Sequence, residues 1–138
     1  MSGRAGERPF RSAVRPSTLA HMPEGYFHLF TRRPEDATAY RAGEPIFEEG
    51  DPARDFYVVR SGSITLHRNG EALETVEEGG IFGELALVDG GARSASATAA
   101  TDAEVVAVDQ ARFHKLVQET PYFAQAVMRV LAERLRRT

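Results

Sequence analysis

The chain has 138 residues, of which 42% are hydrophobic, with a formal net charge of −3 and a pI near 5.8. This length suits one domain with its own core, and the slightly acidic balance gives no general attraction to nucleic acid or to an anionic membrane. The absence of cysteine excludes disulfides, thiolate catalysis and cysteine-ligated metal sites. No apolar run approaches the roughly 18 residues of a membrane-spanning helix, and no signal-peptide core follows Met1. We therefore expect a cytoplasmic protein without a membrane segment.

The first 25 residues have the composition of a solvated tail. Their arginines are spaced like one face of a helix, but the glycines and prolines among them disfavour a helix. We expect residues 1–25 to be a flexible N-terminal tail and residues 26–138 to form the domain. A transit-like or acid-binding arm is the alternative interpretation of the tail.

Residues from about 38 to 108 form many short β-rich runs separated by turn residues. This pattern predicts a mainly β fold of the β-roll or jelly-roll type. Residues 56–60 and 64–68 are the clearest strands, and Asn69-Gly70 after them favours the positive φ angles of a tight hairpin turn. Because side chains alternate along a strand, Ile64 and Leu66 share one face and can both point into the core.

Beyond Val108 the hydrophobic period becomes helical. Asp109 is a good N-cap for a first helix, and Thr120-Pro121 is a good N-cap and first turn for a second. We therefore expect the β-roll to be followed by two C-terminal helices over about residues 109–138. The second helix carries its apolar residues at three- and four-residue steps along one face: Phe123, Val127, Val130, Leu131 and Leu135.

The segment FGELALVDGGARSASATAA, residues 82–100, carries the candidate chemistry. Gly83 would begin a short helix, whose unpaired N–H groups suit an anion or sugar oxygens. Arg93, set among small residues, offers paired N–H donors that match two phosphate oxygens. Glu84 offers a carboxylate that can accept from a sugar hydroxyl. The spacing alone leaves two interpretations, either a ribose phosphate site or an ordinary surface ion pair between Glu84 and Arg93.

This segment resembles the phosphate-binding cassette of cyclic nucleotide-binding domains, the family of the catabolite activator protein and the protein kinase A regulatory subunits. The family pattern is F-G-E-[LI]-[AG]-L, a short loop and then R-[STA]-A, and FGELALVDGGARSA has each part at the usual spacing. Upstream, YRAGEPIFEEGDPARDFYVVRSGSI resembles the first strands of the family. The resemblance covers residues 26–138 and implies a cyclic nucleotide-binding domain.

The resemblance implies a role for each residue of the cassette. Arg93 matches the arginine that binds the cyclic phosphate, and Glu84 matches the glutamate that accepts from the ribose 2′-hydroxyl. The other matching residues lie beside the phosphate (Ser94 and Ala95) and around the ribose (Gly83, Leu85 and Ala86).

Residues outside the cassette match positions that contact the purine base in the family. The matching residues on the roll would contact the side of the base, although a role in the apolar core is an equal alternative for them. Those on the last helix match the helix that covers the base. The residues are Leu66, Leu73 and Val76 on the roll, and Arg134, Leu135 and Thr138 on the helix.

The resemblance implies a receptor rather than an enzyme, with no cofactor and with a cyclic nucleotide as ligand. A threonine after the cassette arginine accompanies cGMP recognition in the family, whereas Ser94 is found in cAMP-binding bacterial members, so we expect cAMP, with cGMP as the alternative. We expect the C-terminal helices to signal to a separate, unidentified effector protein. The DNA-binding branch of the family continues beyond the position of Thr138, so we expect no direct nucleic-acid binding and a monomer or weak homodimer.

Two other functions compete with the receptor. A cupin-like metal-dependent enzyme would need converging histidine and carboxylate ligands, but His21, His28, His67 and His114 are scattered along the chain and form no His-x-His pair. A β-roll that serves as an interaction module without a ligand is the other alternative.

Overall fold

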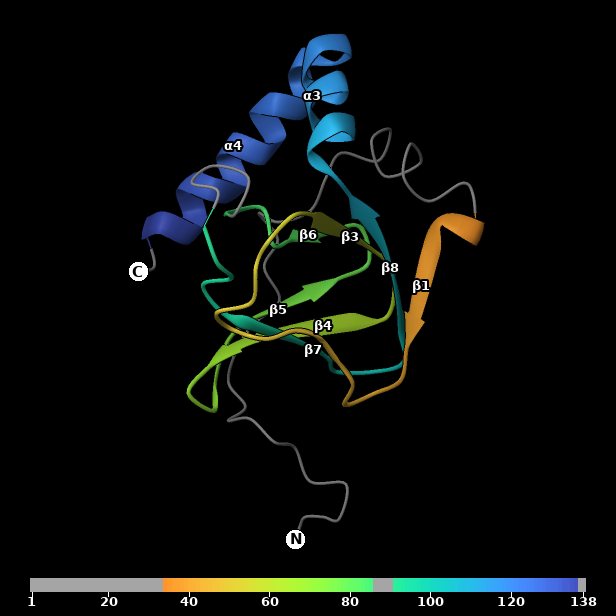
Figure 1. Ribbon diagram of the computed structural model, residues 1–138, viewed down its shortest axis with the longest axis vertical. Coiled ribbons are helices and arrows are strands. Elements are labelled where there is room, and N and C mark those ends of the chain that lie inside the picture. The colour runs from red at the N-terminus through yellow and green to blue at the C-terminus, as the bar shows by residue number, and fades with distance from the viewer. Residues whose placement is uncertain (1–33, 86–90, 137–138) are drawn as a thin grey trace, which may run out of the picture.

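The computed structural model describes residues 34–85 and 91–136 of the chain. Two four-stranded antiparallel sheets pack into a β-roll, and two helices lie over one end of it (Figure 1). This arrangement confirms the predicted fold class. The predicted tail, residues 1–25, lies outside the described residues.

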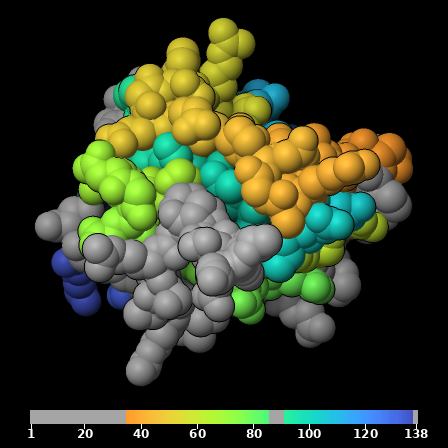
Figure 2. All heavy atoms as spheres, turned by 90° about the horizontal axis from the view of Figure 1, so that it is seen from below, coloured from red at the N-terminus to blue at the C-terminus, as the bar shows by residue number. Residues whose placement is uncertain are grey.

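Apart from the β4–β5 hairpin, whose two strands share one sheet, the strands of the two sheets alternate along the chain. One sheet has the order β1-β8-β3-β6 and the other has the order β2-β7-β4-β5. Seen from below, β1 and β2 lie directly beside the region of β7 and β8 (Figure 2). The strands are β1 (Ala37–Tyr40), β2 (Pro45–Phe47), β3 (Phe56–Ser61), β4 (Ser63–Arg68), β5 (Glu71–Glu77), β6 (Ile81–Phe82), β7 (Ser96–Ala99) and β8 (Ala103–Val108). A 3-10 turn, η1 (Pro34–Asp36), precedes β1, and the helices are α3 (Gln110–Glu119) and α4 (Pro121–Arg136).

The hairpin of β4 and β5 forms where the sequence predicts it. Asn69 and Gly70 have φ angles of 55° and 77°, which close the turn with the twist that the two strands require. Ile64 faces Val76 across the hairpin, and Leu66 faces Glu74. Glu74 therefore lies on the inward face of the sheet, beside apolar neighbours.

The core has two parts. Between the sheets, residues such as Ile64, Val76 and Phe82 are fully buried. Under the helices, Phe56 of β3 packs against Phe123 of α4, with ring centroids 6.3 Å apart. The second part fixes the helices to the end of the roll, and apolar packing holds α4 from Phe123 to Leu131.

The caps of the two helices are partly those that the sequence predicts. The Asp109 carboxylate accepts from the Arg112 N–H at 2.9 Å, which confirms this N-cap. The Thr120 hydroxyl instead donates to the carbonyl of Leu116 at 2.5 Å and so ends α3. The backbone carbonyl of Thr120 accepts from the Phe123 N–H at 2.9 Å at the start of α4. The helix begins at Pro121, so Thr120 and Pro121 take the N-cap and first-turn positions that the sequence predicts.

The inward face of α4 also differs from the prediction in its last turn. Val127 and Val130 are buried as expected, but Leu135 is 59% exposed. Arg134 takes the inward position, because it follows Val127 by seven residues and Val130 by four and so lies on the same face. None of the helices in the described ranges combines the length and the apolar character needed to cross a bilayer.

Candidate functional site

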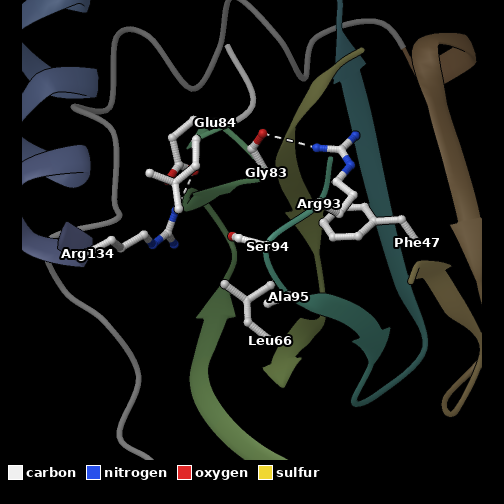
Figure 3. Close-up of a pocket in the computed structure, with 9 residues that line it drawn as sticks. Phe47, Leu66, Gly83, Glu84, Arg93, Ser94, Ala95 and Arg134 are labelled. Atoms are coloured by element: carbon white, nitrogen blue, oxygen red, sulfur yellow. Dashed lines mark hydrogen bonds and ion pairs between the residues drawn. The ribbon is translucent and has the colours of Figure 1, made fainter. Parts of the chain in front are cut away.

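A pocket lies where the cassette, β4 and the end of α4 meet (Figure 3). The structure brings eight of the predicted site residues together around it, and the ninth lining residue, Phe47, was not predicted. Small side chains border the space between the two arginines in Figure 3. The lining residues are Phe47, Leu66, Gly83, Glu84, Leu85, Arg93, Ser94, Ala95 and Arg134.

The remaining predicted residues do not join this lining. Leu73 and Val76 are three positions apart on one strand, so they face opposite sides of the sheet. Leu73 is 42% exposed, whereas Val76 is fully buried in the core, as the alternative interpretation of that residue proposed. Leu135 points to solvent. Ala86 and Thr138 lie outside the described residues.

The backbone of Arg93 is fixed by the turn that follows β2. The Gly50 N–H donates to the Arg93 carbonyl, and the Arg93 N–H donates to the Asp51 carbonyl, each at 2.9 Å. Gly50 has a φ of 92°, a conformation that favours glycine. Because both backbone groups of Arg93 are bound, the start of its side chain has a defined position beside the pocket.

The Arg93 guanidinium is buried without a charged partner. Arg93 is 6% exposed, and it donates to the carbonyl oxygens of Gly83 at 3.1 Å and of Asp55 at 2.8 Å. Its Nε has no hydrogen-bond partner. The guanidinium carbon lies 4.1 Å from the ring centroid of Phe47, which gives a cation–π contact.

Burial lowers the pKa of Arg93, while Tyr57 and Asp55 act in the opposite direction. Over the described part of the chain, no carboxylate lies within salt-bridge distance of this guanidinium. The interpretation of Glu84 and Arg93 as a surface ion pair is therefore wrong, since both side chains are buried and they do not pair. A buried cation without a counter-ion is costly unless an anion binds it.

Gly83 allows the cassette backbone to approach Arg93. Its φ is 82°, and a Cβ at this position would lie 2.8 Å from Arg93 Nη1. Such a contact is too short to be accommodated without a shift of the guanidinium. The backbone conformation therefore favours glycine, and a larger residue would also displace the guanidinium of Arg93.

Glu84 is bound by α4. The carboxylate is 1% exposed and accepts from Arg134 Nη1. Arg134 also donates to both carboxylate oxygens of Glu74, at 3.0 and 2.8 Å, and to the Ile81 carbonyl at 2.8 Å. Burial by itself lowers the pKa of Arg134, but Glu84 and Glu74 outweigh it and raise that pKa above its ordinary range. Arg134 thus ties the last turn of α4 to two strands of the roll.

Sequence reasoning missed two side chains that shape the site. Glu74 is two positions from Val76 and therefore lies on the inward face of β5, and this charged residue in a core pattern was the signal that could have revealed it. Phe47 carried no such signal, because an aromatic residue in a short strand is most often part of the core. Its place beside Arg93 depends on the packing of β2 against the cassette.

The described residues give no support to a metal site. His67 lies on β4 and His114 in α3, and His21 and His28 fall outside the described ranges. Within residues 34–85 and 91–136, no three histidine or acidic side chains are grouped so that they could hold a metal ion. The cupin-like alternative therefore has no ligand set in this part of the chain.

The chain belongs to the cyclic nucleotide-binding domain family, whose model matches residues 37–120. This match contains the whole cassette, so it confirms the family resemblance that the cassette indicated. The cyclic AMP receptor protein of Thermus thermophilus is 38% identical over an alignment of 102 residues, which covers 70% of this chain and 47% of the relative. The chain thus spans about half the length of this relative.

Solved structures agree with this assignment. The Thermus thermophilus catabolite activator protein superposes with a TM-score of 0.69 at 34% identity, covering 88% of this chain and 59% of that one. A protein of a cyclic-GMP-dependent signalling pathway that regulates bacterial phytopathogenesis superposes with a TM-score of 0.70 at 27% identity, covering 85% and 97%. The roll with its C-terminal helices is therefore a cyclic nucleotide-binding domain.

Proposed function

We propose that this chain is a receptor for a cyclic nucleotide, with cAMP as the favoured ligand, and that its function is binding rather than catalysis. The observation that carries this proposal is the buried guanidinium of Arg93, which lines the pocket and has no carboxylate partner among the described residues. A cyclic phosphodiester would supply the missing negative charge, and a guanidinium can bind two of its oxygens.

The other end of the pocket suits a sugar. Glu84 lines the pocket, and a carboxylate has about four acceptor sites, of which Arg134 uses one. The ribose 2′-hydroxyl would donate to this carboxylate while the phosphate binds near Arg93 and Ser94. Ala95 and Gly83 leave room for the ligand because their side chains are small or absent.

The choice between cAMP and cGMP rests on one hydroxyl and on the relatives. The residue after the cassette arginine is Ser94, whose counterpart in cGMP-binding members of the family tends to be threonine. The Thermus relative is a cyclic AMP receptor, whereas the second solved structure belongs to a cyclic-GMP-dependent pathway. We favour cAMP on these grounds and treat cGMP as the alternative ligand.

We further propose that the ligand signals through α4 to a separate protein. Arg134 connects the last turn of α4 to Glu84, so a ligand that binds Glu84 would alter the balance between positions of the helix. Such a shift requires the ligand to bind one helix position more tightly than another. Contacts to both the cassette and the helix would provide that difference.

Isothermal titration of the purified chain with cAMP, cGMP and adenosine tests the proposal. We expect saturable binding of a cyclic nucleotide, tighter for cAMP, and much weaker binding of adenosine because it lacks the phosphate. Equal binding of adenosine and cAMP would contradict the phosphate site, and the absence of binding by either cyclic nucleotide would contradict the receptor. Tighter binding of cGMP would overturn only the choice of base.

A further inference from the structure

Three buried charges lie together beside the sugar end of the pocket. Glu74, on β5, is 3% exposed and binds Arg134 through both carboxylate oxygens, at 3.0 and 2.8 Å. The Glu84 carboxylate accepts a single hydrogen bond from Nη1 of the same guanidinium. Arg134 therefore binds two carboxylates at once. Its Nε and Nη2 donate to Glu74, and its Nη1 donates to Glu84.

The two carboxylates compete for one guanidinium. A guanidinium prefers to bind a carboxylate through two parallel hydrogen bonds, which requires a whole edge of the fork. The edge formed by Nε and Nη2 is occupied by Glu74, so Glu84 receives a contact through one nitrogen only. Without the Glu74 carboxylate, only the Ile81 carbonyl, which accepts from Nη2 at 2.8 Å, would hold this edge of the fork. The guanidinium could then turn toward Glu84 and cover the acceptor sites that face the pocket.

We propose that Glu74 is a positioning residue of the sugar site, which holds Arg134 so that the Glu84 carboxylate remains available to the ribose 2′-hydroxyl. This inference rests on the proposed function, because it concerns how Glu84 is prepared for the ligand. Glu74 does not itself line the pocket, so it acts through Arg134. Leu66, which faces Glu74 across the hairpin, does line it.

The readout is the ratio of the affinities for cAMP and 2′-deoxy-cAMP, which isolates the hydroxyl contact from the phosphate contact. For the unaltered chain we expect cAMP to bind at least about tenfold more tightly, the typical effect of a hydrogen bond to a charged group. Glu84→Gln should bring this ratio close to one. Glu74→Gln should lower it by about threefold or more, while the affinity for 2′-deoxy-cAMP changes little.

Control variants separate positioning from general damage to the sheet. Glu77→Gln alters an exposed carboxylate on the same strand and should leave the ratio unchanged. Glu74→Asp keeps the charge on a shorter side chain and should give an intermediate ratio. If Glu74→Gln does not fold, Glu74→Asp takes its place as the test variant. In the double variant Glu74→Gln with Glu84→Gln, the ratio should match that of Glu84→Gln alone, because both act on one contact.

The outcomes distinguish this inference from the proposed function. If the unaltered chain binds neither nucleotide, the receptor proposal fails and the inference fails with it. If the chain binds cAMP and prefers it to 2′-deoxy-cAMP, but folded Glu74→Gln and Glu74→Asp keep the same ratio, only the role of Glu74 is overturned. A ratio that falls in Glu77→Gln as well would also overturn it, because the effect would then belong to the strand in general.

Discussion

Two buried arginines line the same pocket and have opposite surroundings. Arg134 is bound by two carboxylates, and its pKa is raised by them despite burial. Arg93 has a similarly small exposed surface, yet it contacts backbone carbonyls and an aromatic ring, and burial lowers its pKa. The charge of Arg134 is neutralised within the protein, whereas that of Arg93 is not.

This difference separates a structural role from a binding role. A guanidinium that already has carboxylate partners gains little from an added phosphate, and its loss leaves two acids buried without a cation. A guanidinium without a counter-ion gains much from an anion, and its loss removes an unsatisfied group from the interior. We therefore expect the loss of Arg134 to reduce stability more than the loss of Arg93 does. The loss of Arg93 should in turn be the one that mainly reduces the affinity for the ligand.

Arg134→Leu should give the largest effect, a loss of about 3–5 kcal/mol in the free energy of unfolding, because it removes the cation that binds the buried carboxylates of Glu74 and Glu84. Urea denaturation followed by circular dichroism measures this loss. Arg129→Leu on the same helix is the control, and since Arg129 is exposed it should change the unfolding free energy by less than about 0.5 kcal/mol. Equal effects of the two variants would show that the buried network contributes nothing.

Arg93→Leu should have the opposite profile. We expect the affinity for cAMP to fall by about 100-fold or more, since two charge-assisted hydrogen bonds to the phosphate are lost. The free energy of unfolding should change by less than about 1 kcal/mol, because no ion pair is broken. Calorimetric titration measures the affinity and urea denaturation of the same preparation measures the stability. An unchanged affinity would contradict the binding role of Arg93.

Gly83→Ala should sharpen the assignment of Arg93 to the phosphate. The substitution places a side chain in the left-handed region, which costs about 1–2 kcal/mol of stability, and its Cβ would lie 2.8 Å from Arg93 Nη1. Because the guanidinium must move, we expect a loss of cAMP affinity in addition to the loss of stability. Gly43→Ala is a matched control, with a φ of 92° and nothing within 4 Å of the added Cβ. It should lose stability and keep its affinity.

Phe47→Leu should give the smallest effect. The ring 4.1 Å from the guanidinium carbon contributes a cation–π contact of about 0.5–2 kcal/mol. A double-mutant cycle with Arg93→Leu, measured by urea denaturation, isolates this contact from the packing of the ring. We expect a coupling at the lower end of that range, and strictly additive effects would show that the aromatic ring does not hold the arginine.

Much of the fold could be predicted because its signals are local. Asn69-Gly70 closes the β4–β5 hairpin and Asp109 caps α3 as the residue types require. The last turn of α4 could not be predicted in this way. Hydrophobicity favoured Leu135 for the inward face, but two carboxylates from distant segments, Glu74 on β5 and Glu84 in the cassette, reverse that preference for Arg134.

The sequence by itself determined the family and the cassette, because Gly83, Glu84 and Arg93 stand at a spacing that the local backbone of the cassette imposes. Only the tertiary structure decided which charges pair. It placed Glu84 with Arg134, 50 residues away, and left Arg93 without a carboxylate. The physical reason is that a local pattern fixes φ, ψ and the direction of a side chain, whereas the partner of a buried charge depends on which distant elements the core brings beside it.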